Sequence, residues 1–106
     1  VGAMQQLEGC ITMGLGYTLS EEVRFRNGEV LDKNFTSYTL PHFSAVPKIE
    51  GVLMDNPELP AQGGGEPAII LVGALVANAV FDATGVRMNQ LPLTKVRVKA
   101  ALALRG

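Results

Sequence analysis

Residues 62–85 read QGGGEPAIILVGALVANAVFDATG, and this stretch decides how the second half of the chain folds. Three glycines precede Glu66 and Pro67, and a long apolar run follows them. Proline is favoured at the first position of a helix, because its missing N–H has no helical partner to lose there. The pattern therefore predicts a helix that begins at Pro67, ends near Asp82 and is stopped by Gly85.

The uncharged run covers residues 67–81 only. A membrane span needs roughly 20 apolar residues, so we expect this helix to pack in a protein core instead.

The chain opens with another helical pattern. Its apolar residues recur at the spacing of one helix face, at Met4, Leu7, Ile11 and Leu15. Three glycines (Gly9, Gly14 and Gly16) interrupt the pattern, and each lowers helix stability by about 1 kcal/mol relative to alanine. Such a helix needs tertiary support, and glycine allows another backbone or a ligand to approach closely. We expect the helix to fray between Gly16 and Leu19.

The Asn27-Gly28 pair is a strong hairpin signal, because both turn positions need positive φ. It separates an alternating run at residues 22–26 from a second run at residues 29–31. These runs predict a β-hairpin with one solvated face. Residues 34–40 and 49–54 predict further strands.

A last helix is expected over residues 95–104, with Thr94 as its N-cap. The order of helix, β-hairpin and further strands, then two C-terminal helices, defines an α+β fold. The length of 106 residues suits one domain, and the sequence has no internal repeat, so we expect residues 1–106 to form a single subdomain. The chain does not begin with methionine and enters a helical pattern at once, which favours a segment of a longer protein.

The composition excludes several functional classes. Hydrophobic residues make up 47% and charged residues 18%, which is typical of a globular protein. A net charge of -1 with no long basic run argues against a nucleic-acid or anionic-membrane surface. The single cysteine, Cys10, excludes an internal disulfide and is expected to be a buried thiol. The single histidine, His42, argues against a metal site built from protein ligands, so no metal-ligating residue is predicted.

The glycine run before Glu66 is the feature most suggestive of chemistry. Residues 63–65 carry no side chains, so their backbone N–H groups can face an anion or a cofactor. We expect Glu66 at or next to the helix N-cap, held by the turn that follows, where its carboxylate could act as a general base. The run has two simpler interpretations: a flexible linker, and a glutamate that only complements the helix dipole.

The chain resembles the xanthine oxidase and aldehyde oxidoreductase family of molybdenum hydroxylases along nearly its whole length. The matching segments occur in the order of the family, and their combination is more specific than any one of them. They are Gln6-Leu7-Glu8-Gly9, Met13-Gly14-Leu15-Gly16-Tyr17 with Glu21-Glu22, residues 34–41, Gly65-Glu66-Pro67, and residues 77–85 with 91–93. Residues 47–50 and 91–94 are most similar to the branch of isoquinoline 1-oxidoreductase and membrane-associated aldehyde dehydrogenase.

The resemblance implies the C-terminal part of a large subunit that binds molybdopterin, often as the cytosine dinucleotide. Glu66 matches the general base that deprotonates a metal-bound hydroxyl, whose oxygen then attacks an aldehyde or N-heterocycle carbon. Gln6 matches a residue that contacts the pterin, and the backbone at Gly64 and Gly65 matches the part that lies against the cofactor. The family holds molybdenum through the pterin dithiolene. The chain departs from the family pattern in its three glycines and in Ala68, where a second proline is common.

The implied partners are the remainder of the large subunit, an iron–sulfur small subunit and, in the branch named above, a cytochrome c subunit. We expect the isolated chain to bind no cofactor and to be inactive. Both the bacterial periplasm and the cytoplasm remain open as locations. The alternative hypothesis is a small non-enzymatic interaction domain that uses residues 63–67 as a docking loop.

Overall fold

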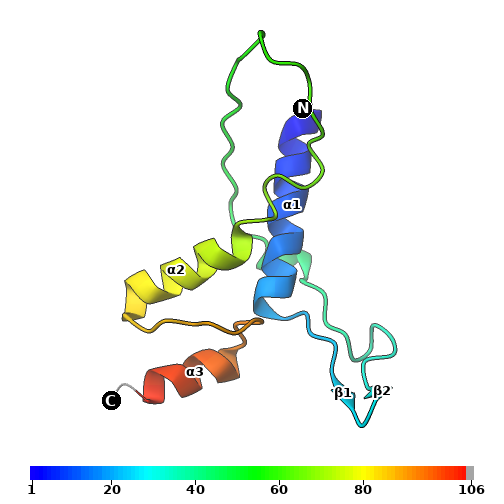
Figure 1. The fold of residues 1–106 in the computed structure, drawn as a ribbon, viewed down its shortest axis with the longest axis vertical. Coiled ribbons are helices and arrows are strands. Elements are labelled where there is room, and N and C mark those ends of the chain that lie inside the picture. Colours follow the sequence, from blue (N-terminus) through cyan, green and yellow to red (C-terminus); the bar gives the residue numbers. More distant parts are fainter. Residues whose placement is uncertain (105–106) are drawn as a thin grey trace.

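The computed structural model describes residues 1–104 of the chain as three helices, a two-stranded sheet and long connecting loops (Figure 1). The elements are α1 (Gly2–Leu19), β1 (Phe25–Arg26), β2 (Glu29–Val30), a short 3₁₀ helix η1 (Phe43–Ala45), α2 (Val72–Thr84) and α3 (Lys95–Ala103). This arrangement confirms the α+β class, the N-terminal helix, the hairpin and the two C-terminal helices. None of the helices within residues 1–104 has the length and apolar character that a membrane crossing requires.

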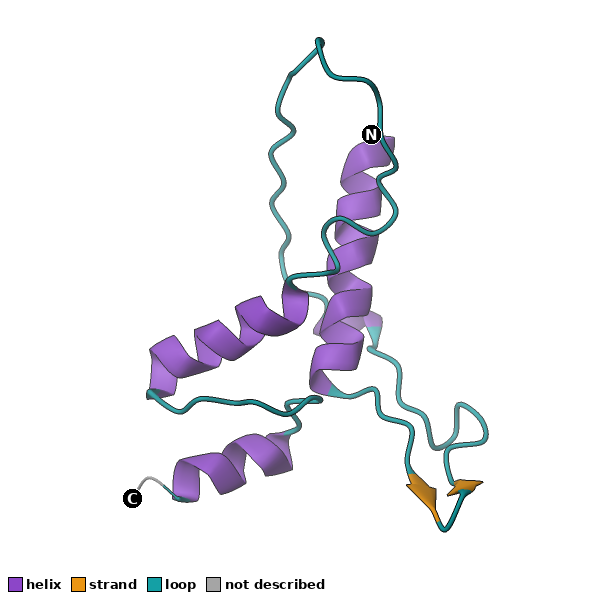
Figure 2. Cartoon of the chain, in the orientation of Figure 1, coloured by secondary structure: helices purple, strands orange, loops and turns teal. Residues whose placement is uncertain are grey.

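Helix α1 is the longest helix and the axis around which the rest is arranged (Figure 1). It continues to Leu19, so the expected fraying from Gly16 does not occur. The loop between η1 and α2 passes beyond the N-terminal end of α1 and returns along it (Figure 2). On this path Gly51 lies against the side chains of Met4 and Leu7.

Helix α2 packs on α1 where glycine removes a side chain. A Cβ atom built on Gly14 would lie 2.7 Å from the Cβ of Val72, which is too close for two carbon atoms that are not bonded to each other. Val72 is 4% exposed and Gly14 is buried. The close approach that glycine permits in α1 is therefore used by α2.

The buried part of the molecule is small and lies where α1, α2 and the segment before α3 meet. Its apolar members are Cys10, Val72 and Leu93, and Thr18 is fully buried beside them. The backbone N–H of Leu93 donates to the carbonyl of Thr18 at 2.6 Å. Thr94 caps α3 as predicted, because its side chain accepts a hydrogen bond from the N–H of Arg97.

The hairpin turn forms as the sequence predicts. Asn27 has φ 51° and Gly28 has φ 80°, and the strands pair Phe25 with Val30 in antiparallel register. All four strand residues are exposed, so both faces of the hairpin are solvated and the expected packed face is absent from residues 25–30.

Two local predictions are wrong. Residues 34–40 and 49–54 form loops, because a strand needs a partner backbone and no described segment pairs with either of them. Helix α2 begins at Val72 and not at Pro67. Residues 66–71 instead form successive turns, in which the N–H of Ile69 donates to the carbonyl of Glu66 and the N–H of Val72 to that of Ile69.

Candidate cofactor-binding site

The segment that carries Glu66 is fixed to α1 by two side chains. The thiol of Cys10 donates a hydrogen bond to the carbonyl of Gly65 at 2.9 Å. The hydroxyl of Tyr17 donates to the carbonyl of Ile69 at 2.6 Å. Because Cys10 and Tyr17 are seven residues apart, about two helical turns, they lie on one face of α1. The turn that contains Glu66 is thus anchored on both sides of that residue.

Gly14 lies between these two donors on the same helix face. Its missing side chain allows Val72 to approach α1 directly after the anchored turn. We call Cys10, Gly14 and Tyr17 the anchoring face of α1. It holds the chain from Gly65 to Val72.

The sequence predicted close approach at the α1 glycines and the burial of Cys10, but it did not predict that Cys10 and Tyr17 bind the glycine segment. The signal was present, since Cys10, Gly14 and Tyr17 are spaced i, i+4 and i+7. Hydrogen bonds to backbone carbonyls leave no trace in the sequence of the segment that accepts them, so the partner could not be named.

Glu66 lies next to an anchored carbonyl, but it is not at the N-cap that the sequence predicted. The N-cap of α2 is Leu71, because the turns at residues 66–71 displace the helix start. The side chain of Glu66 is exposed, and no hydrogen bond or ion pair within residues 1–104 involves its carboxylate. The turn holds the backbone of Glu66 and leaves the carboxylate available to solvent or to a ligand.

Gln6, Gly64 and Gly65, which the sequence predicted to bind the cofactor, lie close to the hydrogen bond between Cys10 and Gly65. Gln6 is exposed and precedes Cys10 by one helical turn, so the two residues are neighbours on the helix surface. Gly64 and Gly65 are exposed, and a Cβ atom on either would meet nothing within 4 Å. The structure therefore brings Gly65 to the helix turn that follows Gln6, and it leaves this backbone open on the side where a side chain would stand.

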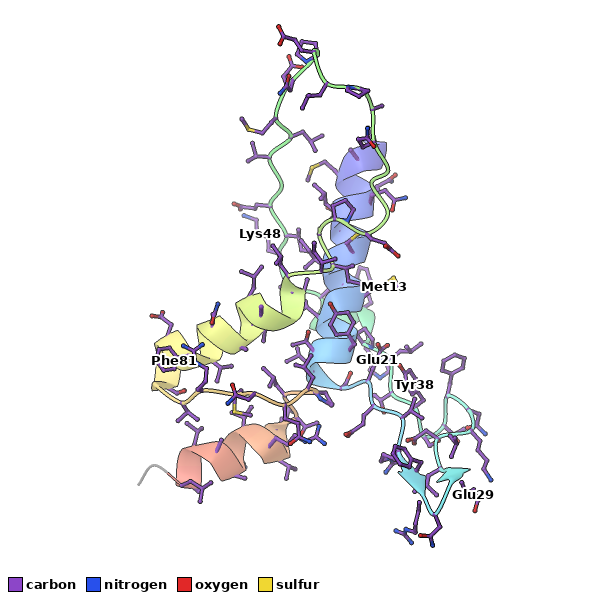
Figure 3. The ribbon with its side chains drawn as sticks, in the orientation of Figure 1. Met13, Glu21, Glu29, Tyr38, Lys48 and Phe81 are labelled. Atoms are coloured by element: carbon purple, nitrogen blue, oxygen red, sulfur yellow. The ribbon has the colours of Figure 1, made fainter. Side chains whose placement is uncertain are left out.

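A groove along α1 lies elsewhere. It has a volume of about 520 Å³ and is formed by α1 residues and by the segment around η1, including Glu8, Met13 and Phe43. Met13 is labelled on α1 in Figure 3. None of the four predicted site residues lines this groove.

An ion pair that shifts the pKa values of both partners lies in the hairpin, away from the segment that carries Glu66. The Arg24 guanidinium lies 2.6 Å from the carboxylate of Asp32, which also accepts the N–H of Arg24. These contacts lower the pKa of Asp32 to about 2 and raise the pKa of Arg24. A second ion pair, Glu22 with Arg97 at 2.7 Å, ties α3 to the segment that follows α1. The first pair closes the base of the hairpin, and the second joins α3 to the segment after α1.

Comparison with known proteins shows which family the chain resembles. Residues 2–47 match the family described as the molybdopterin cofactor-binding domain. A nicotinate dehydrogenase subunit of Pseudomonas putida is 35% identical over 105 residues, which cover 99% of this chain and 9% of that protein. The aldehyde oxidoreductase molybdenum-binding subunit PaoC of Escherichia coli is 34% identical over 99 residues, covering 87% of this chain and 14% of that protein.

A solved structure supports the same assignment. The quinoline 2-oxidoreductase of Pseudomonas putida 86 superimposes with a TM-score of 0.77 at 28% identity, covering 94% of this chain and 14% of that one. The chain thus spans less than a sixth of each of these relatives. The resemblance seen in the sequence is confirmed: the chain belongs to the xanthine oxidase and aldehyde oxidoreductase family of molybdopterin-binding proteins and matches one segment of each of these relatives.

Proposed function

We propose that the protein containing this chain is a molybdopterin-dependent oxidoreductase that oxidises an aldehyde or an N-heterocycle with water as the oxygen source. Glu66 is its general base. The observation that carries the proposal is the anchored turn: Gly65 is bound by Cys10, and the exposed carboxylate of Glu66 follows directly.

The described residues fit such a cofactor. The backbone at Gly64 and Gly65 is open, so a flat group can approach it without meeting a side chain. The amide of Gln6 can both donate and accept hydrogen bonds, as the edge of a pterin requires. Gln6, Gly64 and Gly65 would hold the cofactor, which we propose to be the cytosine dinucleotide form.

The cofactor, when bound, supplies the two-electron redox chemistry. The reaction replaces a C–H bond of the substrate by a C–O bond, and two electrons pass to an acceptor. Glu66 takes a proton from the water-derived nucleophile, which requires its carboxylate to be ionised. The hydrogen bonds at Gly65 and Ile69 fix the backbone around Glu66, and no hydrogen bond within residues 1–104 competes for a proton at its carboxylate.

The substrate class and partners rest on the relatives. One relative is named a nicotinate dehydrogenase and another an aldehyde oxidoreductase, so an N-heterocycle and an aldehyde are the two classes to test. We propose that the segment works with the remainder of the large subunit, an iron–sulfur small subunit and a cytochrome c subunit. On its own it would be inactive.

The test is the substitution Glu66→Gln in the complete protein. Benzaldehyde and nicotinate are the substrates, and dichlorophenolindophenol is the electron acceptor. A general base contributes about 10²- to 10⁴-fold to the rate, so kcat should fall by at least about 100-fold with molybdenum content unchanged. The matched control is Glu58→Gln, an exposed carboxylate in the loop before the glycines. Turnover of Glu66→Gln near the wild-type rate would disprove the role of Glu66.

A further inference from the structure

We propose that Tyr17 and Cys10 are positioning residues that set the place of the Glu66 carboxylate by fixing the turn around it to α1. This inference rests on the function proposed above for Glu66. Neither side chain is bonded to the carboxylate, so each would act through the backbone.

The two hydrogen bonds are made on either side of Glu66 in the sequence. Gly65, whose carbonyl accepts from Cys10, directly precedes it, and Ile69, whose carbonyl accepts from Tyr17, follows three residues later. A third bond, from the N–H of Ile69 to the carbonyl of Glu66 at 3.0 Å, closes the turn between them. The backbone of Glu66 therefore has little freedom, and only its side-chain torsions remain to be set.

The bond from Tyr17 diverts the chain from helical geometry. In a helix that started at Pro67, the carbonyl of Ile69 would accept from the N–H of Gly73. In the structure it accepts from Tyr17 and from the N–H of Val72. The tyrosine hydroxyl thus favours the turn over an earlier helix start, and the turn is the conformation in which Glu66 is exposed beside the open glycines.

The two donors differ in strength. The thiol of Cys10 is a weak donor, whereas the phenol of Tyr17 is a good one. Cys10 is 5% exposed, so its thiol has little access to water and donates instead to the carbonyl of Gly65. We expect Tyr17 to determine the conformation of the turn and Cys10 to determine its distance from α1.

A small displacement matters for the proposed chemistry. Moving a catalytic group by about 1 Å can lower the rate about 100-fold, even when the change is made away from the reacting atoms. Loss of an anchor should therefore lower kcat and leave KM nearly unchanged, because substrate binding would not depend on the turn.

The test compares Tyr17→Phe with Tyr38→Phe in the complete protein. Tyr38 is the other tyrosine; it lies at the base of the hairpin (Figure 3), and its hydroxyl makes no hydrogen bond within residues 1–104. Tyr17→Phe keeps the ring and removes only the donor. We expect the amides of Ile69 and Val72, which are hydrogen-bonded within the turn, to exchange with deuterium at least about fivefold faster. We expect kcat to fall about tenfold or more and KM to stay within about twofold. Tyr38→Phe should change none of these.

Cys10 provides a conservative rescue. Cys10→Ala removes the donor, whereas Cys10→Ser keeps one, so exchange of the Ile69 amide, which donates to the carbonyl of Glu66, should rise in the first variant and stay near wild type in the second. Unchanged exchange in both Tyr17→Phe and Cys10→Ala would overturn the anchoring. Faster exchange with unchanged kcat would overturn the positioning role. Both results can be told apart from the outcome of Glu66→Gln. Retained turnover in that variant would refute the role of Glu66 as general base.

Discussion

The hairpin and the glycine segment are both built on glycine, but they obtain their shape in different ways. Asn27 and Gly28 adopt positive φ because the two-residue turn demands it, and the Arg24–Asp32 contact closes the base of the same hairpin. The chain around Gly65 and Ile69 is shaped by donors on α1, more than 50 residues away in sequence. A turn with local causes can be predicted from its own residues, and a turn with distant causes cannot.

Among the substitutions that test this difference, those on the anchoring face should have the largest effect on stability. Gly14→Ala places a Cβ atom 2.7 Å from Val72 and must force α2 away from α1. Overpacking of this kind costs about 1–3 kcal/mol. Protection of the α2 amides against hydrogen exchange should fall accordingly.

Gly9→Ala is the matched control, because a Cβ atom there meets nothing within 4 Å. It should stabilise α1 by about 1 kcal/mol through helix propensity alone. Equal effects of the two alanines would mean that the close contact between α1 and α2 is absent in solution.

The local turn should respond to a change in its own residues only. Gly28 has φ 80°, and a side chain in this left-handed region costs about 1–2 kcal/mol. In Gly28→Ala, we expect faster exchange of the Leu31 amide, which donates to the carbonyl of Arg24 at 2.8 Å. Exchange of the Ile69 and Val72 amides should not change. A change there would show that the hairpin and the glycine segment are coupled.

Features with local causes were predicted from the sequence, and features with distant causes were not. The spacing of Met4, Leu7 and Ile11 predicted α1, Asn27-Gly28 predicted the hairpin, and Gly85, where φ is 67°, predicted the end of α2. Each of these signals is local. The start of α2 was misplaced by five residues, because the local preference for Pro67 was outweighed by the bonds of residues 66–72 to α1 and to one another.

The residues of the candidate site were named from local motifs as well, and their roles stay predictions. The motif around Gly65-Glu66-Pro67 could be recognised in the sequence, as could Gln6, and the structure brings Gly65 to the neighbouring turn of α1. The strands expected at residues 34–40 and 49–54 have the composition of strands, but among residues 1–104 no backbone lies alongside to pair with them. Pairing partners, like hydrogen-bond donors, are properties of the whole fold.

The smallest effect on stability is expected when the pH is lowered. The pKa of Asp32 is lowered to about 2, chiefly by hydrogen bonds from Arg24, so in the folded state the carboxylate stays ionised below its ordinary value of 3.8. The contribution of the pair is thus fully present above about pH 4 and is lost as the pH falls toward 2. Asp32→Asn should remove this pH dependence from the protection factor of the Leu31 amide, which is the intrinsic exchange rate divided by the observed rate at the same pH. If the wild-type protection factor were constant between pH 4 and 2, the ion pair would not stabilise the hairpin.

A crystal structure of the complete protein with its cofactor bound tests the central claim most directly. The account predicts that the backbone of Gly64 and Gly65 lies against the pterin, that the amide of Gln6 is within about 3 Å of a polar atom of the cofactor, and that Glu66 faces the substrate pocket. A cofactor bound away from residues 63–66, with the carboxylate of Glu66 turned to solvent, would contradict it.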